Sequence, residues 1–159
     1  MIEYPKYKKV LFCTDFSKNS DCAFDYAFGV AKRDDSILYI MHVIPDNPKE
    51  IYHDMYVNKK NLEKIKANIQ KNLEKLFEEK YLSQIKDRSN VRVVIMSGRE
   101  SEEILKFVRK EKIDLITIGT HGRTGIKYAV FGSVAEKIVR RSPIPVFIIP
   151  LEKRNGRNK

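Results

Sequence analysis

The sequence predicts an α/β fold: a single domain with a five-stranded parallel sheet and helices on both faces. Short apolar runs alternate with longer segments of helical periodicity along the chain. The runs are almost continuously apolar, which is typical of strands buried on both faces of a parallel sheet. Regular strand–helix alternation indicates crossover connections between parallel strands. The length of 159 residues suits one domain.

The strands are expected at five apolar runs. The first, YKKVLFCT, ends in a polar turn, and the second, ILYIMHVI, is long and apolar. Glycine, proline or polar residues border the runs, as expected at strand ends. The expected strands are 7–14, 37–44, 91–97, 114–119 and 145–150.

Helices are expected between these strands. The longest carries apolar residues at intervals of three and four, which gives one buried stripe. Asp15, Ser17 and Ser20 are alternative caps for the first helix, and Glu100 or Ser101 starts the third. The expected helices are 17–33, 59–86, 100–111 and 133–141.

The charge balance is basic. Lysine and arginine number 31 against 21 acidic residues, a net charge of +10. Such a charge attracts nucleotides, nucleic acids and anionic membranes alike. The basic residues are spread along 1–150 and cluster only in the tail 151–159, which we expect to be disordered. We therefore favour a solvated surface, expect no membrane partner and disfavour nucleic acid, whose charge-driven binding would weaken steeply with salt.

The two cysteines and the first residues bear on the cellular compartment. Cys13 and Cys22 fit no metal or redox spacing, so we expect buried, reduced thiols. The beginning, MIEYPKYKK, has no apolar signal core, and no stretch approaches the roughly 18 apolar residues of a membrane span. We expect a cytoplasmic protein.

A glycine cluster marks the candidate site. Four of the seven glycines fall in the loop between the fourth strand and the last helix: Gly119, Gly122, Gly125 and Gly132. Glycine lets backbone amides approach a phosphate closely, and a helix beginning at Ser133 presents unpaired N–H groups and a positive dipole end. Arg123 and Lys127 add positive charge. A glycine-rich turn without a ligand is the alternative.

Two other phosphate motifs are excluded. A P-loop requires a Gly-Lys pair, which the sequence lacks. A dinucleotide fingerprint requires glycines directly after the first strand, whereas the first glycine is Gly29, inside the first expected helix.

The loop resembles a known signature. Gly119-Thr-His-Gly122, nine residues and then Gly132-Ser133 match the G-x2-G-x9-G-[ST] pattern of the ATP-binding branch of the universal stress protein family. The segments KKVLFCTDFSKNS, MHVI, IDLITIGTHGR and SPIPVFIIP also resemble the strands and turns of this family. The resemblance covers nearly the whole chain.

The resemblance implies a Rossmann-like fold of the adenine nucleotide alpha-hydrolase-like type. It implies a homodimer, often formed through the last strand, and the apolar PVFIIP run would otherwise be an unpaired edge. It also implies ATP as the cofactor, with Mg²⁺ or Mn²⁺ bound through the phosphates. We also expect a protein partner, a client whose identity the sequence does not give.

The site residues follow from the same resemblance. Asp15 would lie near the ribose and adenine, beside Cys13 and Thr14, and Val43 would contact the adenine. Helix capping is the alternative role for Asp15 and plain core packing for Val43. Relatives often have proline or alanine where Cys13 stands. The phosphate-binding positions would be Gly119, Gly122, Gly132 and Ser133, with Val134 following in the helix and Arg123 adding charge.

Candidate catalytic groups are few. His121 or Asp15 could position water in a slow ATP hydrolase, but no acid that orients His121 is evident, so we expect it to bond the loop backbone. His42 reads as structural, His53 has no companion, and no spacing suggests a metal held by the protein. We expect an ATP-binding regulatory module of the stress response, in which ATP sets the dimer surface or the segment 45–60, with slow hydrolysis as the alternative.

Overall fold

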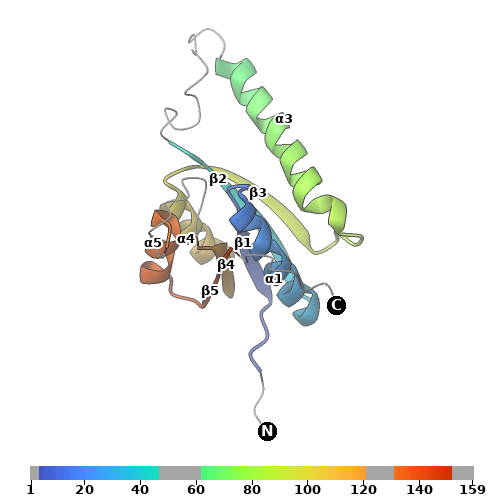
Figure 1. Cartoon of the computed structure of the whole chain (residues 1–159), viewed down its shortest axis with the longest axis vertical. Helices are drawn as coiled ribbons and strands as arrows, with labels where there is room; N and C mark the ends of the chain where they lie inside the picture. The colour runs from blue at the N-terminus through green and yellow to red at the C-terminus, as the bar shows by residue number, and fades with distance from the viewer. Residues whose placement is uncertain (1–3, 47–61, 121–130, 152–159) are drawn as a thin grey trace.

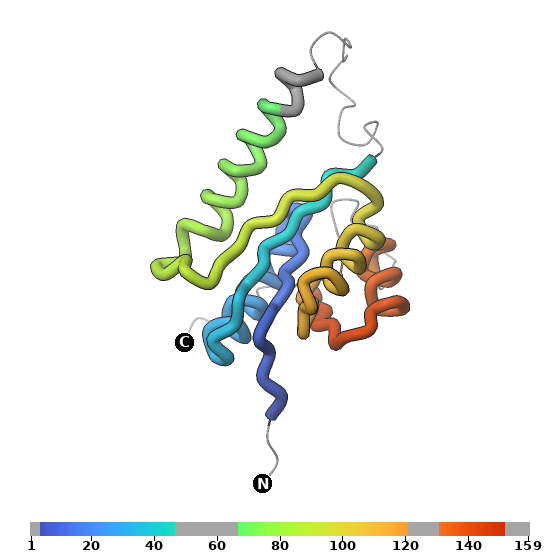
Figure 2. Tube along the Cα trace, turned by 180° about the vertical axis from the view of Figure 1, so that it is seen from behind, coloured from blue at the N-terminus to red at the C-terminus, as the bar shows by residue number. Residues whose placement is uncertain are grey.

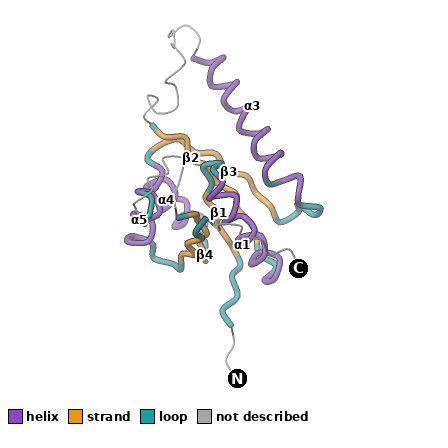
Figure 3. The backbone as a smooth tube through the Cα atoms, in the orientation of Figure 1, coloured by secondary structure: helices purple, strands orange, loops and turns teal. Residues whose placement is uncertain are grey.

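The computed structural model describes residues 4–46, 62–120 and 131–151, which contain five strands and four α-helices (Figure 1). The strands are β1 (Lys9–Cys13), β2 (Ile37–Pro45), β3 (Val91–Gly98), β4 (Leu115–Gly119) and β5 (Val146–Ile149). The helices are α1 (Lys18–Asp34), α3 (Leu62–Lys80), α4 (Glu100–Glu111) and α5 (Ser133–Arg141). Figure 3 shows the alternation of strand and helix that the sequence predicted.

The strands form one sheet in the order β3-β2-β1-β4-β5. Every pair of neighbours is parallel, which confirms the predicted fold class. The strands begin or end within two residues of the expected positions. β2 runs one residue further than expected, to Pro45, which pairs with Gly98 of β3.

Two apolar cores lie on opposite faces of the sheet. On one face, Phe12 and Ile40 pack with residues of α1 and α3, such as Phe24 and Phe77. On the other, residues of β1, β2 and β4 pack with α4 and α5. Figure 2 shows α4 and α5 together on one side of the sheet, away from α3. Both faces are thus covered, as the apolar strands require.

Helix caps resolve the alternatives left by the sequence. Ser17 is the N-cap of α1, and its side chain accepts a hydrogen bond from the Ser20 amide. The N-cap of α4 is Arg99, whose side chain makes no cap hydrogen bond. Neither Glu100 nor Ser101 is therefore the cap, although the helix does begin at Glu100.

The expectation of one helix over 59–86 was too long at its end. α3 stops at Lys80, and a 3₁₀ turn covers Leu82–Gln84. Nearby polar side chains take the last carbonyl groups, which an α-helix leaves unpaired: Ser83 donates to the Glu79 carbonyl and Gln84 to that of Lys80. Residues 59–61 and the segment 47–60 lie outside the described residues.

The cysteines are free, as predicted. Cys13 is buried, but Cys22 is only half-buried, so burial of both thiols was wrong for the second. Cys22 lies within α1 and is one of the partly buried residues that pack against the core. Within 4–46, 62–120 and 131–151, no helix has the length and apolarity needed to cross a membrane.

We predict that Asp34 makes folding sensitive to acid. Its carboxylate accepts hydrogen bonds from Arg33 and from the Tyr7 amide, and these lower the pKa of Asp34 to about 2, the bond from Arg33 having the larger effect. Because the folded pKa lies below its ordinary value of 3.8, this contribution is present above pH 4 and is lost as the pH falls toward 2.

Urea denaturation at pH 7, 4, 3 and 2 measures this contribution. We expect Asp34→Asn to lower the free energy of unfolding at pH 7 and to flatten its decline between about pH 4 and pH 2. Asp25→Asn, on the exposed face of α1, is the matched control. Parallel pH profiles for both variants would contradict the assignment.

Candidate functional site

The candidate site lies at the carboxyl ends of β1 and β4. The chain leaves β1 toward β2 on one side, whereas β4 pairs with β1 on the other, so the strand order reverses here. In open α/β sheets, ligands bind at such a switch point. The structure brings four of the predicted binding residues to this edge: Cys13, Thr14, Asp15 and Gly119.

The turn after β1 is held from within the protein. The Thr14 amide donates to the Met41 carbonyl at 2.9 Å, and its hydroxyl donates to Ser20 Oγ at 3.1 Å. The Thr14 hydroxyl also accepts the Phe16 amide at 2.9 Å. His42 Nδ1 lies 2.8 Å from the Thr14 carbonyl oxygen, in line with the predicted structural role of His42. Thr14 therefore shapes the turn.

Asp15 follows in the same turn and is half-buried. Its Oδ1 accepts the amide of Ser17 at 3.0 Å. Because Ser17 is the N-cap of α1, Asp15 supports the cap without being it. Asp15 therefore orients the capping residue Ser17, and this hydrogen bond holds the Asp15 carboxylate just after the end of β1.

Gly119 occupies the tightest position of the site. A Cβ atom there would lie 3.0 Å from three atoms of Asn19, one of them the backbone oxygen. Asn19 in turn donates to the Ile149 carbonyl at 3.2 Å and accepts from the Thr120 hydroxyl at 3.1 Å. Glycine is thus required where β4 meets the start of α1.

The start of α5 lies at the same edge. The Gly132 amide donates to the Thr120 carbonyl at 2.6 Å, which holds the helix against the end of β4. Gly132 is the N-cap and offers no side-chain cap bond, and Ser133 is exposed. The dipole and the unpaired N–H groups at the start of a helix such as α5 favour the approach of an anion. Gly122 and Arg123, like His121, lie outside the described residues.

An apolar wall borders this edge. Cys13 and Val43 are buried in one cluster, and Val134 of α5 packs against it. This matches the core-packing alternative for Val43. Burial raises the pKa of the Cys13 thiol to about 12, so the group is neutral at physiological pH.

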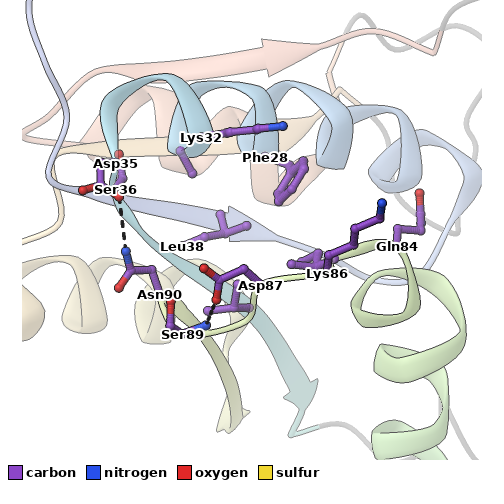
Figure 4. A pocket seen from close by; sticks show the side chains of 13 residues that line it. Phe28, Lys32, Asp35, Ser36, Leu38, Gln84, Lys86, Asp87, Ser89 and Asn90 are labelled. Atoms are coloured by element: carbon purple, nitrogen blue, oxygen red, sulfur yellow. Dashed lines mark hydrogen bonds between the residues drawn. The ribbon is translucent and has the colours of Figure 1, made fainter.

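Among the described residues, no group of three or more His, Cys, Asp or Glu side chains could hold a metal ion. A cavity of about 490 Å³ lies elsewhere, between the end of α1 and the turn before β3. Phe28, Leu38 and Lys86 are among its lining residues (Figure 4). It is at the amino-terminal end of β2 and β3, the opposite end of the sheet from Asp15.

Sequence reasoning missed two residues that build this edge. Asn19 stands four residues before Ala23 on the buried stripe of α1, and a polar residue on such a stripe is the signal that could have found it. Tyr81, whose hydroxyl reaches Thr14, continues the spacing of Leu73 and Phe77 by four more residues.

The fold and the switch-point site place the chain among the doubly wound α/β proteins. More narrowly, it belongs to the universal stress protein family, whose sequence model matches residues 6–150. Universal stress protein MJ0577 of Methanocaldococcus jannaschii is 32% identical over 155 residues, which cover 90% of this chain and 94% of that protein.

Solved structures agree with this assignment. That of MJ0577 superposes with a TM-score of 0.73 at 26% identity, covering 93% of this chain and 99% of the other. A universal stress protein solved in complex with cAMP has a TM-score of 0.63 at 20% identity and 93% and 100% coverage. The Archaeoglobus fulgidus universal stress protein in complex with dAMP has a TM-score of 0.55 at 16% identity and 91% and 99% coverage. The last two share the fold.

We predict that Gly119→Ala destabilises the protein by about 1–3 kcal/mol, since its Cβ presses on the Asn19 backbone. Gly29→Ala is the matched control, because a Cβ at that position of α1 meets nothing within 4 Å. We expect the control to stabilise by about 0.5–1 kcal/mol. Chemical denaturation measures both, and equal stabilities for the two variants would show that β4 and α1 are not in tight contact.

Proposed function

We propose that this protein belongs to the ATP-binding branch of its family and acts as a nucleotide-dependent regulatory module. The observation that carries the proposal is the start of α5, which has no side-chain cap and is held at the end of β4 beside Gly119. A helix start of this kind suits a phosphate group. The motif from Gly119 to Ser133 has the spacing of the ATP-binding signature.

The two sides of the switch point suit the two ends of a nucleotide. The apolar wall of Cys13, Val43 and Val134 offers a surface for a base. Asp15 lies at the end of β1, between this wall and α1, where its carboxylate can accept hydrogen bonds from ribose hydroxyls or an adenine amine. Two relatives were solved with adenine nucleotides, cAMP and dAMP, which supports the same ligand class here.

Phosphates would meet the Gly132 and Ser133 side of the site, with Gly122 and Arg123 adding contacts from the loop. Thr14 contributes by shaping the turn, since its own polar groups bond within the protein. Mg²⁺ or Mn²⁺ would be carried by the ATP phosphates. The basic charge of +10 favours binding of the anionic ligand.

We predict that the purified protein binds ATP and that Asp15→Asn weakens binding about tenfold, the cost of a lost hydrogen bond to a charged group. Asparagine keeps the oxygen that accepts the Ser17 amide, so the turn is preserved. Asp25→Asn makes the same charge change on the exposed face of α1 and should bind like the wild type. Titration calorimetry measures all three affinities.

Two results would contradict the proposal. Absence of ATP binding at millimolar concentration would refute the function. Equal weakening by both asparagine variants would remove the specific role of Asp15 and leave only general charge attraction. Mass spectrometry of small molecules released from the purified protein identifies which adenine nucleotide is bound.

We further propose a homodimer formed through β5. Among the described strands, β5 lies at the edge of the sheet and pairs with β4 alone. Phe147 of β5 is 36% exposed and Val139 of α5 is 47% exposed, which is unusual for large apolar side chains next to a free edge. A second copy of the chain would cover both.

We predict a dimer by light scattering that Ile148→Pro disrupts. The carbonyls of Pro145 and Ile149 accept hydrogen bonds from β4. Because successive residues of a strand point their backbone groups to opposite sides, the N–H group of Ile148 points away from β4. Proline removes that outward N–H group, and it also replaces an isoleucine side chain that packs against the core. Circular dichroism checks that the variant stays folded, and a monomeric wild type across working concentrations would be the contrary result.

A further inference from the structure

A chain of hydrogen bonds joins the end of α3 to the turn after β1. The Tyr81 hydroxyl donates to Asp21 Oδ1 at 2.8 Å and lies 2.6 Å from the Thr14 hydroxyl. Lys80 donates to the other oxygen of Asp21 at 2.6 Å. Because the Tyr81 proton goes to the carboxylate, the Tyr81 oxygen can accept from Thr14, whose single hydroxyl proton faces both the Tyr81 and the Ser20 oxygens. Burial raises the pKa of Tyr81 above its usual value, which keeps this proton in place.

At its other end, this series of hydrogen bonds reaches Phe16, the residue after Asp15. The Thr14 hydroxyl accepts the Phe16 amide, and Phe16 has a φ of 62°. A bulky residue adopts this left-handed conformation only where its surroundings enforce it. The Phe16 ring lies 5.0 Å from that of Phe77 and 6.1 Å from that of Tyr81, measured between centroids. The Phe16 ring also lies 4.8 Å from that of His42. The end of α3 therefore contacts the Phe16 ring directly and reaches the Phe16 amide through Thr14.

The conformation of Phe16 determines where Asp15 points. Asp15 precedes it, and the Asp15 carboxylate bonds the amide of Ser17 that follows it. A change of Phe16 out of the left-handed region would separate these two groups. The Asp15 carboxylate is thereby linked, through Phe16 and Thr14, to Tyr81. Tyr81 is only 1% exposed and follows α3, far from Asp15 in the sequence.

α3 is anchored to the sheet at this end. Within its described part, Leu73 and Phe77 are buried, whereas the residues of 67–72 are exposed or half-buried. Figure 1 shows α3 standing beside the sheet and approaching the other elements at its last turns. A shift of the turn after β1 would therefore act on the attached end of a long helix.

We propose that Tyr81 is a positioning residue for the Asp15 turn and couples occupancy of the nucleotide site to the packing of α3. This rests on the proposed ATP binding. Coupling of this kind is reciprocal: a ligand that favours the ordered turn stabilises the end of α3, and loosening that end weakens the ligand. The exposed part of α3 is then the surface that reports whether the site is filled.

Tyr81→Phe tests the coupling, because it removes one hydroxyl and keeps the ring contacts with Phe16. Tyr39→Phe is the matched control: it removes a tyrosine hydroxyl from β2 on the opposite face of the sheet, where the ring packs on Phe107. Titration calorimetry with ATP should give a dissociation constant raised about fivefold or more for Tyr81→Phe and unchanged within about twofold for Tyr39→Phe.

Hydrogen exchange supplies a measurement that a purely structural role would not change. In the wild type, saturating ATP should slow amide exchange over 77–81, and in Tyr81→Phe this slowing should be absent at saturating ATP. The comparison is made with and without ATP in the same variant, so any general loss of stability cancels.

The outcomes separate the two proposals. Tight ATP binding by the wild type with equal affinity in Tyr81→Phe would overturn the coupling and leave the proposed function intact. Unchanged exchange over 77–81 when the wild type binds ATP would overturn it in the same way. A wild type that does not bind ATP would refute the proposed function and the role of Tyr81 with it.

Discussion

The sheet edge formed by the carboxyl ends of β1 and β4 depends on the contact between Asn19 and Gly119. One side-chain amide donates to β5, accepts from the residue after β4 and belongs to α1, so it joins three elements that are distant in sequence. The contact is possible because Gly119 has no Cβ, which lets the helix approach the strand end. Because the amide is buried, its two hydrogen bonds also avoid the cost of an unpaired polar group.

This contact positions both halves of the candidate site. Thr120, which bonds Asn19, accepts through its carbonyl the amide of Gly132 at the start of α5. The same first turn of α1 contains Ser17 and Ser20, which are bonded to the turn at Asp15. The start of α5 and the Asp15 carboxylate are therefore held relative to one another through α1.

The two faces of the sheet contribute differently. On the face of α4 and α5, the edge is apolar and includes Cys13 and Val43, which suits the flat surface of a base. On the face of α1 and α3, hydrogen bonds join Tyr81 to Thr14 and to Asp21, and Thr14 in turn to Ser20. Such buried networks are rigid, so a disturbance at one member is felt at the others. These hydrogen bonds connect the turn after β1 with the end of α3.

The sequence by itself determined the class of fold and most strand and helix bounds to within a few residues, because hydrophobic periodicity is a local property. It left open which side chain caps α1, placed the end of the long helix too late and did not single out Asn19 or Tyr81. Tertiary structure decided these points. The role of Asn19 exists only because β4 and β5 lie beside α1, and that of Tyr81 only because α3 ends beside the turn after β1. Contacts between distant segments depend on how the layers pack, which no local pattern encodes.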